Sequence, residues 1–168
     1  MILVNTPDDG GCIVSFAISH SRAGSFRMSC RNPFELPDRL ETRLQVVLAF
    51  WQDLRRGQNA LPFSDDVRLP QLSELPGRVF LLAVFAPPER FRIEFLNAAM
   101  PVSSATGKFL DELPPGTEFA FLRAQASATL EAAAPTLLRL TDNSGDTFLR
   151  LLLPLWGNGQ VNMILGAL

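Results

Sequence analysis

Residues 78–95 read RVFLLAVFAPPERFRIEF, and this stretch decides the fold. Its first eight residues are almost continuously apolar, which is typical of a central strand buried on both faces. Pro87-Pro88-Glu89 then turns the chain. From Phe91 to Phe95 apolar residues alternate with charged ones, which predicts an adjoining strand with one wet face.

A helix and three more strands are expected downstream. Residues 97–115 are mostly irregular, and Thr117 is a good cap for a helix predicted over 118–133. Three strands follow, separated by short loops that suit hairpins: 136–141, 147–155 and 160–165. This order predicts an α+β fold, a five-stranded antiparallel sheet with its helices on one face. Numbered along the chain from Arg78, the strands are expected in the spatial order 2-1-5-4-3.

Upstream of this sheet, the apolar residues recur at helical spacing. Asp38 is a good N-cap, and Glu41 stands three residues later to complete a capping box. Apolar residues then follow at intervals of three and four as far as Gly57, which ends the chain's extra N-terminal helix, predicted over 38–56.

Two apolar residues of this helix, Val46 and Phe50, lie off its main stripe. A helix that is apolar over more than one face must bury the surplus, so we expect these residues to form an interface. A homodimer with two-fold symmetry is the commonest solution. The alternative is that residues 1–33 fold over the helix and cover it.

Residues 1–37 are interpreted as an N-terminal extension, and residues 38–168 as the domain proper. In the extension, Asp8-Asp9-Gly10-Gly11 is a strong turn signal between two short apolar runs, which predicts a hairpin. The stretch 19–29 is rich in Ser, Arg and Gly and is predicted to be a loop, and a linker that contains proline follows.

The composition argues against several classes of partner. The net charge is -2 at pH 7, and no cluster of Lys and Arg is denser than Arg55-Arg56, so nucleic-acid binding is not expected. The N-terminus has no basic n-region and no apolar stretch long enough for a bilayer. We therefore expect a cytoplasmic protein without membrane insertion, and we expect both cysteines to stay free.

No catalytic or metal-binding constellation is visible in the sequence. His20 is the only histidine and lies in a Ser/Arg-rich stretch, where a solvated side chain is typical. Cys12 lies eight residues before it, but no third group is evident to orient a nucleophile–base pair. The adjacent carboxylate pairs occur in turns and loops. We therefore expect no enzyme activity and no bound metal, haem or flavin.

The order of the elements resembles that of the PAS domain family, in particular small stand-alone bacterial PAS-like proteins. The matching strings are 48–57 (LAFWQDLRRG), 75–82 (LPGRVFLL), 106–113 (TGKFLDEL), 152–156 (LLPLW) and 162–166 (NMILG). In order, they are similar to the family's N-terminal helix, the start of its first strand, the segment before its long helix, and its two closing strands. The resemblance covers about residues 40–168. The chain departs from the pattern at Asn97-Ala98-Ala99, where relatives often have Gly-Thr, and at Phe63, where they often have Arg.

The resemblance implies a ligand pocket between sheet and helix, mostly apolar with a few polar groups that fix orientation. The expected apolar walls are Phe95, Phe109, Phe119, Leu122, Leu138, Leu151 and Met163, and the expected polar contacts are Asn97 and Arg123. Every one of the apolar residues would serve equally well as plain core.

The resemblance therefore implies a sensory and signalling domain that binds a small apolar ligand or a signalling protein partner, with no output domain in the chain. Because the chain stops soon after the last strand, its signal is expected to pass to a separate protein or through self-association. A ligand-free interaction module of the same fold is the alternative. A small-molecule enzyme on an α+β sheet is a third reading. It would need a buried Asp, Tyr or His, where the strand faces offer chiefly Leu and Phe.

Overall fold

The computed structural model describes residues 4–5, 12–14, 26–28, 36–100, 103–113, 119–141 and 147–168. The strands are β1 (Val4–Asn5), β2 (Cys12–Val14), β3 (Phe26–Met28), β4 (Val79–Phe85), β5 (Arg90–Leu96), β6 (Thr136–Thr141), β7 (Thr147–Gly157) and β8 (Gln160–Ala167). The α-helices are α1 (Thr42–Asp53), α2 (Leu69–Glu74) and α3 (Leu122–Ala132), and the 3-10 turns are η1 (Ser64–Asp66), η2 (Ser103–Ala105) and η3 (Leu110–Glu112).

The strands form one antiparallel sheet in the order β1-β2-β3-β6-β7-β8-β4-β5. Its five longer strands lie as β5-β4-β8-β7-β6, which is the predicted order 2-1-5-4-3. The α+β class and the five-stranded antiparallel sheet are thereby confirmed. Hairpin connections explain the success, because short loops leave consecutive strands few alternatives to pairing as neighbours.

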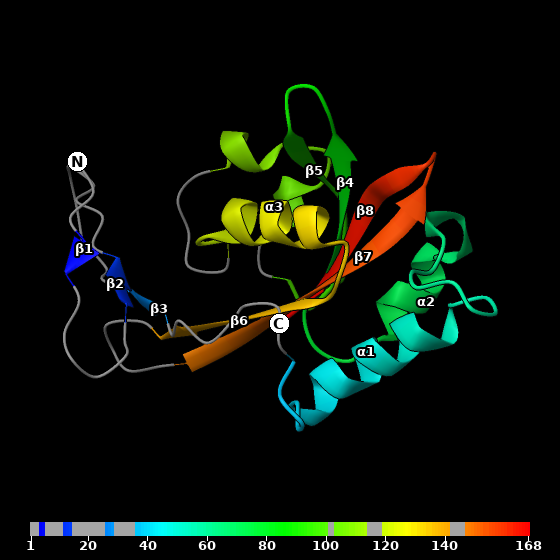
Figure 1. Cartoon of the computed structure of the whole chain (residues 1–168), viewed down its shortest axis with the longest axis horizontal. Coiled ribbons are helices and arrows are strands. Elements are labelled where there is room, and N and C mark those ends of the chain that lie inside the picture. The colour runs from blue at the N-terminus through cyan, green and yellow to red at the C-terminus, as the bar shows by residue number, and fades with distance from the viewer. Residues whose placement is uncertain are drawn as a thin grey trace.

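The N-terminal extension continues the same sheet beyond β6 (Figure 1). Strands β1 and β2 pair antiparallel, with Val4 opposite Val14, and the turn expected at residues 8–11 lies outside the described residues. Strand β3 lies inside the stretch 19–29 that was predicted to be a loop, and that prediction is wrong at residues 26–28. The physical reason is long-range: β3 supplies partners to the outer edge of β6, with Met28 opposite Leu140.

The helices cover both faces of the sheet, and the prediction that they lie on one face is wrong. Figure 1 shows α3 on one side of the sheet, and α1 with α2 on the other. Leu122 and Ala126 of α3 pack with Phe80 and Leu152, whereas Trp51 of α1 packs in a second cluster. That second cluster takes the alternate residues of the same strands: Leu81, Leu151, Leu153 and Leu165. Strands this apolar on both faces need a cover on each side.

Helix α1 begins four residues later than predicted. It runs from Thr42 rather than from residue 38, and Glu41 occupies the N-cap without a side-chain cap. The Glu41 carboxylate instead accepts a hydrogen bond from Arg43 Nε at 3.1 Å, so the predicted capping box is wrong. Leu40 still packs against the α1 side of the core from outside the helix. Its burial therefore does not require a helical turn, and the apolar spacing alone was misleading.

Helix α3 lies within the predicted range 118–133 but begins only at Leu122. Phe121 before it and Ala133 after it have φ angles of 57° and 46°, in the left-handed region where a helix cannot continue. The predicted cap Thr117 lies outside the described residues.

A β-bulge in β5 reverses the facing of its side chains. Leu81 stands opposite Phe95 and Leu82 opposite Ile93, so Glu94 is the extra residue. Ile93 packs on the α3 side, whereas Phe95 packs on the α1 side. The prediction that β5 keeps one apolar and one wet face is therefore wrong beyond Ile93, because a bulge resets the alternation of period two.

Pro154 lies in β7, where its missing N–H removes no hydrogen bond of the sheet. The pairing of β7 with β6 ends at Leu152 opposite Thr136, so β6 does not reach Pro154. The Pro154 carbonyl accepts a hydrogen bond from Trp51 Nε1 at 2.8 Å, and the Trp156 N–H donates to Pro62 O at 2.8 Å. Groups from α1 and from the chain before η1 therefore take the place of a neighbouring strand.

Gly166→Ala tests how closely the α3 side of the sheet is packed. A Cβ at this position would lie 2.1 Å from Phe80 Cζ, because the Phe80 ring rests directly on the glycine. We expect the substitution to lower the free energy of unfolding by about 1–3 kcal/mol in urea denaturation, as overpacking does. In a Phe80→Leu background the smaller side chain leaves room, so the added methyl should be less destabilising. Equal losses in both backgrounds would contradict this packing.

Candidate functional site

The most unusual feature of the described chain is a buried polar network between α3 and the sheet. Four residues form it: Gln125 and Thr129 from α3, Thr136 from β6 and Arg150 from β7. Thr129, Thr136 and Arg150 have no exposed surface and Gln125 is 5% exposed, so the network lies fully inside the protein. Polar groups buried this deeply must be hydrogen-bonded to one another.

Arg150 is the centre of this network. Its Nε donates to Gln125 Oε1 at 2.8 Å, and its Nη2 donates to the Ala120 carbonyl at 2.8 Å, just before α3. Burial lowers the pKa of Arg150 to about 9, because the interior disfavours the charged form. That value still lies above neutral pH, so the layer between α3 and the sheet contains a guanidinium cation.

Gln125 connects the helix to both strands. Its Nε2 lies 3.0 Å from the Arg150 carbonyl and 3.3 Å from the Thr136 carbonyl, and it donates to both. Thr129 Oγ1 donates to the Gln125 carbonyl at 2.8 Å and lies 2.7 Å from Thr136 Oγ1. Both the amide oxygen and the amide nitrogen of Gln125 are therefore hydrogen-bonded. These bonds fix the position of α3 on β6 and β7.

This network was missed in the sequence, although a signal for it is present. Residues 148–155 read FLRLLLPL, and Arg150 is the one charged residue in an otherwise apolar central strand. A charge at such a position is buried unless the strand lies at an edge, so the interruption itself marked the site. Gln125 and Thr129 gave no comparable signal, because polar residues are common on the solvent face of a helix.

The predicted pocket residues do not form one pocket, because the sheet separates them. Phe119 and Leu122 lie on the α3 side. Leu138 belongs to the same side, since it stands opposite Arg150 across the β6–β7 pair. The other strand residues pack on the α1 side: Phe95, Leu151 and Met163. The bulge at Glu94 moves Phe95 there, and alternation along β7 places Leu151 on the face opposite Arg150.

The two predicted polar contacts lie elsewhere. Asn97 is 7% exposed; its Oδ1 accepts from the Val79 N–H at 3.1 Å, and its Nδ2 donates to the Gly77 carbonyl at 2.8 Å. Those two bonds join Asn97, just after β5, to the start of β4 and to the residues before it. Arg123 is exposed on α3.

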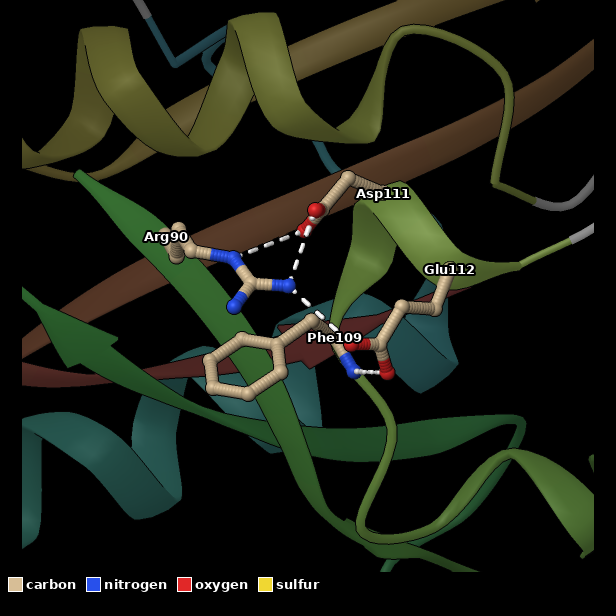
Figure 2. Close-up of polar contacts among 4 residues, drawn as sticks. All are labelled: Arg90, Phe109, Asp111 and Glu112. Atoms are coloured by element: carbon tan, nitrogen blue, oxygen red, sulfur yellow. Dashed lines mark hydrogen bonds and ion pairs between the residues drawn. The ribbon is translucent and has the colours of Figure 1, made fainter. Parts of the chain in front are cut away.

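Phe109 belongs to a separate cluster at the β5 edge, which Figure 2 shows. Arg90 reaches Asp111 with Nε at 3.2 Å and with Nη2 at 2.9 Å, and the same Nη2 lies 3.1 Å from Glu112 Oε1. The guanidinium carbon lies 3.7 Å from the centre of the Phe109 ring, within cation–π distance. The other Glu112 oxygen accepts from the Phe109 N–H at 3.1 Å (Figure 2).

This cluster holds the segment before η3 along the outer edge of β5. Ile93 N donates to the Lys108 carbonyl at 2.9 Å, and Gly107 N donates to the Ile93 carbonyl at 2.7 Å. The segment therefore occupies hydrogen-bonding groups that an edge strand would otherwise leave exposed. Its evident role is structural.

The sequence candidates for chemistry are only partly described. Cys12 lies in β2, whereas His20 and Cys30 lie outside the described residues. Within the described ranges, no group of three or more His, Cys, Asp or Glu side chains is arranged to hold a metal ion. None of the helices in those ranges has the length and apolar character needed to cross a membrane.

No protein-family model, curated protein or solved structure matches this chain.

Arg90→Met tests the electrostatics of the β5-edge cluster. The pKa of Asp111 is held below its usual range, chiefly by the hydrogen bonds from Arg90. In the variant, the Asp111 carboxyl should titrate at a higher pH than in the wild type, which carboxyl ¹³C NMR would measure. Because the folded-state pKa is depressed, the contribution of this pair to stability is present above the unfolded pKa and is lost as the pH falls through the folded one.

Arg92→Met is the matched control, because Arg92 pairs with Glu94 rather than with Asp111. It should leave the Asp111 titration unchanged. An Asp111 carboxyl that titrates identically in the wild type and in Arg90→Met would show that Arg90 does not set its pKa.

Proposed function

We propose that this protein is a PAS-like, non-enzymatic sensory and signalling domain whose ligand binds between α3 and the sheet, beside Arg150. The observation that supports the proposal is the buried guanidinium, which lies with a few polar partners on the face of the sheet whose core cluster contains Phe91, Ile93 and Leu152. Binding sites for small molecules are built in this way, with apolar walls and a few polar groups that fix orientation.

The chemistry of Arg150 narrows the ligand class. A guanidinium presents only donors, in a planar fork that matches carboxylate and carbonyl oxygens. A small, largely apolar molecule with one acidic or carbonyl group would fit such a layer. Its apolar part would replace packing against side chains such as Leu122, and its oxygen would meet the cation.

The proposal also includes a route by which the ligand state reaches the opposite face. Arg150 and Pro154 lie on the same strand, β7. On the other side of the sheet, the Pro154 carbonyl holds α1 through the indole N–H of Trp51. A shift of β7 at Arg150 would therefore change the position of α1 on the sheet. A partner protein or a second copy bound to α1 would respond to that change.

Arg150→Met tests the ligand proposal. Wild-type protein should carry a small molecule through purification, visible as added mass in native mass spectrometry and released on denaturation. The variant should lose this mass, because it keeps the apolar volume and removes the donors. Arg139→Met is the matched control, since Arg139 is exposed on the neighbouring strand β6 and should keep the ligand.

Arg150→Lys covers the case in which the methionine variant fails to fold, because lysine keeps the charge but not the fork. It should bind the ligand more weakly than the wild type does. A wild type without added mass, or added mass that persists in both Arg150 variants, would refute the ligand proposal.

A ligand-free interaction module is the second candidate, and one observation favours it. The Phe80 ring rests on Gly166 and fills part of the α3 side with the protein's own side chains. In that case the Arg150 network would serve only to fix α3, and the signal would come from partner binding. The native mass spectrum distinguishes the two candidates directly.

Self-association through α1 is part of the proposed signalling function. Val46 is 43% exposed, whereas Phe50 is half-buried and packs partly against the α1 side of the core. The described strands of the extension lie beyond β6 in the sheet, and their pairing does not bring them to α1. We propose that a second copy contacts Val46 and Phe50.

Val46→Glu should therefore convert a dimer into a monomer in light scattering, because it places a charge in the contact, and Phe50→Glu should do the same. Gln45→Glu is the control, since Gln45 is exposed at the adjacent helix position and its substitution adds the same charge. A monodisperse wild-type monomer would rule out this interface.

A further inference from the structure

Helix α3 begins and ends at residues with left-handed backbone angles. Phe121, its N-cap, has φ 57° and ψ 9°, and Ala133, its C-cap, has φ 46° and ψ 40°. Left-handed angles are common at a helix C-terminus, where glycine is the usual residue. A phenylalanine with such angles is an outlier, because its Cβ crowds the backbone. Strain of this kind persists only where neighbouring groups hold the residue in place.

Phe121 lies in a tight turn that leads into the helix. The Leu122 N–H donates to the Phe119 carbonyl at 3.1 Å, so residues 119–122 form a β-turn with Ala120 and Phe121 at its centre. The angles of Phe121 are close to those of the third residue of a type II turn, where glycine is the usual choice. In a type I turn the same position has a negative φ, which suits phenylalanine.

The two turn types differ mainly in the orientation of the central peptide group. In this turn it is the Ala120–Phe121 peptide, and its rotation by about half a turn converts one type into the other. The Ala120 carbonyl belongs to this peptide and accepts a hydrogen bond from Arg150 Nη2 at 2.8 Å. Rotation would point that oxygen away from Arg150. The hydrogen bond therefore stabilises the orientation in which Phe121 is strained.

Arg150 is well placed to hold this peptide. Its side chain has no exposed surface, and its Nε donates to Gln125 Oε1 at 2.8 Å. The Gln125 N–H in turn donates to the Phe121 carbonyl at 3.0 Å. A hydrogen bond from a charged donor is roughly twice as strong as one between neutral groups. One planar guanidinium is therefore bonded both to the turn before α3 and to a side chain of α3 itself.

We propose that Arg150 and the Ala120–Phe121 peptide form a conformational switch at the start of α3. While Arg150 Nη2 donates to the Ala120 carbonyl, the turn keeps its strained form. When that donor is removed or is drawn to another acceptor, the peptide rotates and Phe121 relaxes to a negative φ. A molecule with an acceptor for Arg150 would operate the switch. This last step rests on the ligand site proposed above, whereas the switch itself does not.

Phe121→Gly and Phe121→Ala together test the switch, because both remove the ring and they differ only in the Cβ. In the wild-type background, Phe121→Gly should have a Tm about 2–4 °C higher than Phe121→Ala, since glycine adopts a positive φ without strain. With Arg150→Met added, the peptide can rotate, so this difference should vanish or reverse. Arg150→Lys is a second background if the methionine variant does not fold. The difference should shrink there too, because lysine lacks the guanidinium fork.

Ala133→Gly is the matched control, because Ala133 has a positive φ at the far end of α3. It should raise the Tm by a similar amount whether Arg150 is present or replaced. The proposal would be overturned if Phe121→Gly were no more stable than Phe121→Ala in the wild-type background. A Tm difference that stays the same in the Arg150 variants would overturn it as well. Neither result would bear on the native mass spectrum, which tests the ligand separately.

Discussion

The structure depends on one constraint: the central strands β7, β8 and β4 are apolar on both faces and must be covered on both. Along β7, Leu151 and Leu153 pack towards α1, while Leu152 packs towards α3. At about 25 cal/mol per Å² of apolar surface, leaving either face in water would offset much of the marginal stability of a domain. The strand sequences therefore require a helix on each face of the sheet. Helix α1 belongs to the core as much as α3 does.

Arg150 is the exception within that constraint. Charged groups inside proteins are destabilising unless their hydrogen bonds are well placed, and the lowered pKa of Arg150 expresses this penalty. Gln125 provides one acceptor for the guanidinium and donates to the strand carbonyl of the same residue. A cation buried with these partners would favour one position of α3 on the sheet, where an apolar layer would tolerate several. The same property would make the layer responsive to a molecule that competes for the guanidinium.

The five longer strands and their order could be predicted from the sequence because hairpin loops and apolar runs are local signals. For the pocket residues, what failed was the prediction of which face of the sheet each side chain occupies. Phe95 follows the alternation of Phe91 and Ile93 in the sequence, yet a single bulge at Glu94 turns it to the other side of the sheet. A bulge depends on the register with the partner strand, which no local pattern contains. For this reason, Phe95 lies on the opposite face of the sheet from Phe119 and Leu122.

The candidate sites were harder to predict than the strands, because each joins residues that are distant in sequence. Arg150 alone was conspicuous; its partner Gln125 becomes meaningful only once α3 crosses β7. β6 stops short of Pro154, which leaves the outer edge of β7 beyond Leu152 to the chain before η1. That same early end of β6 exposes the carbonyl that Trp51 binds. The early end of β6 thus leaves this part of β7 to contacts with both α1 and the chain before η1.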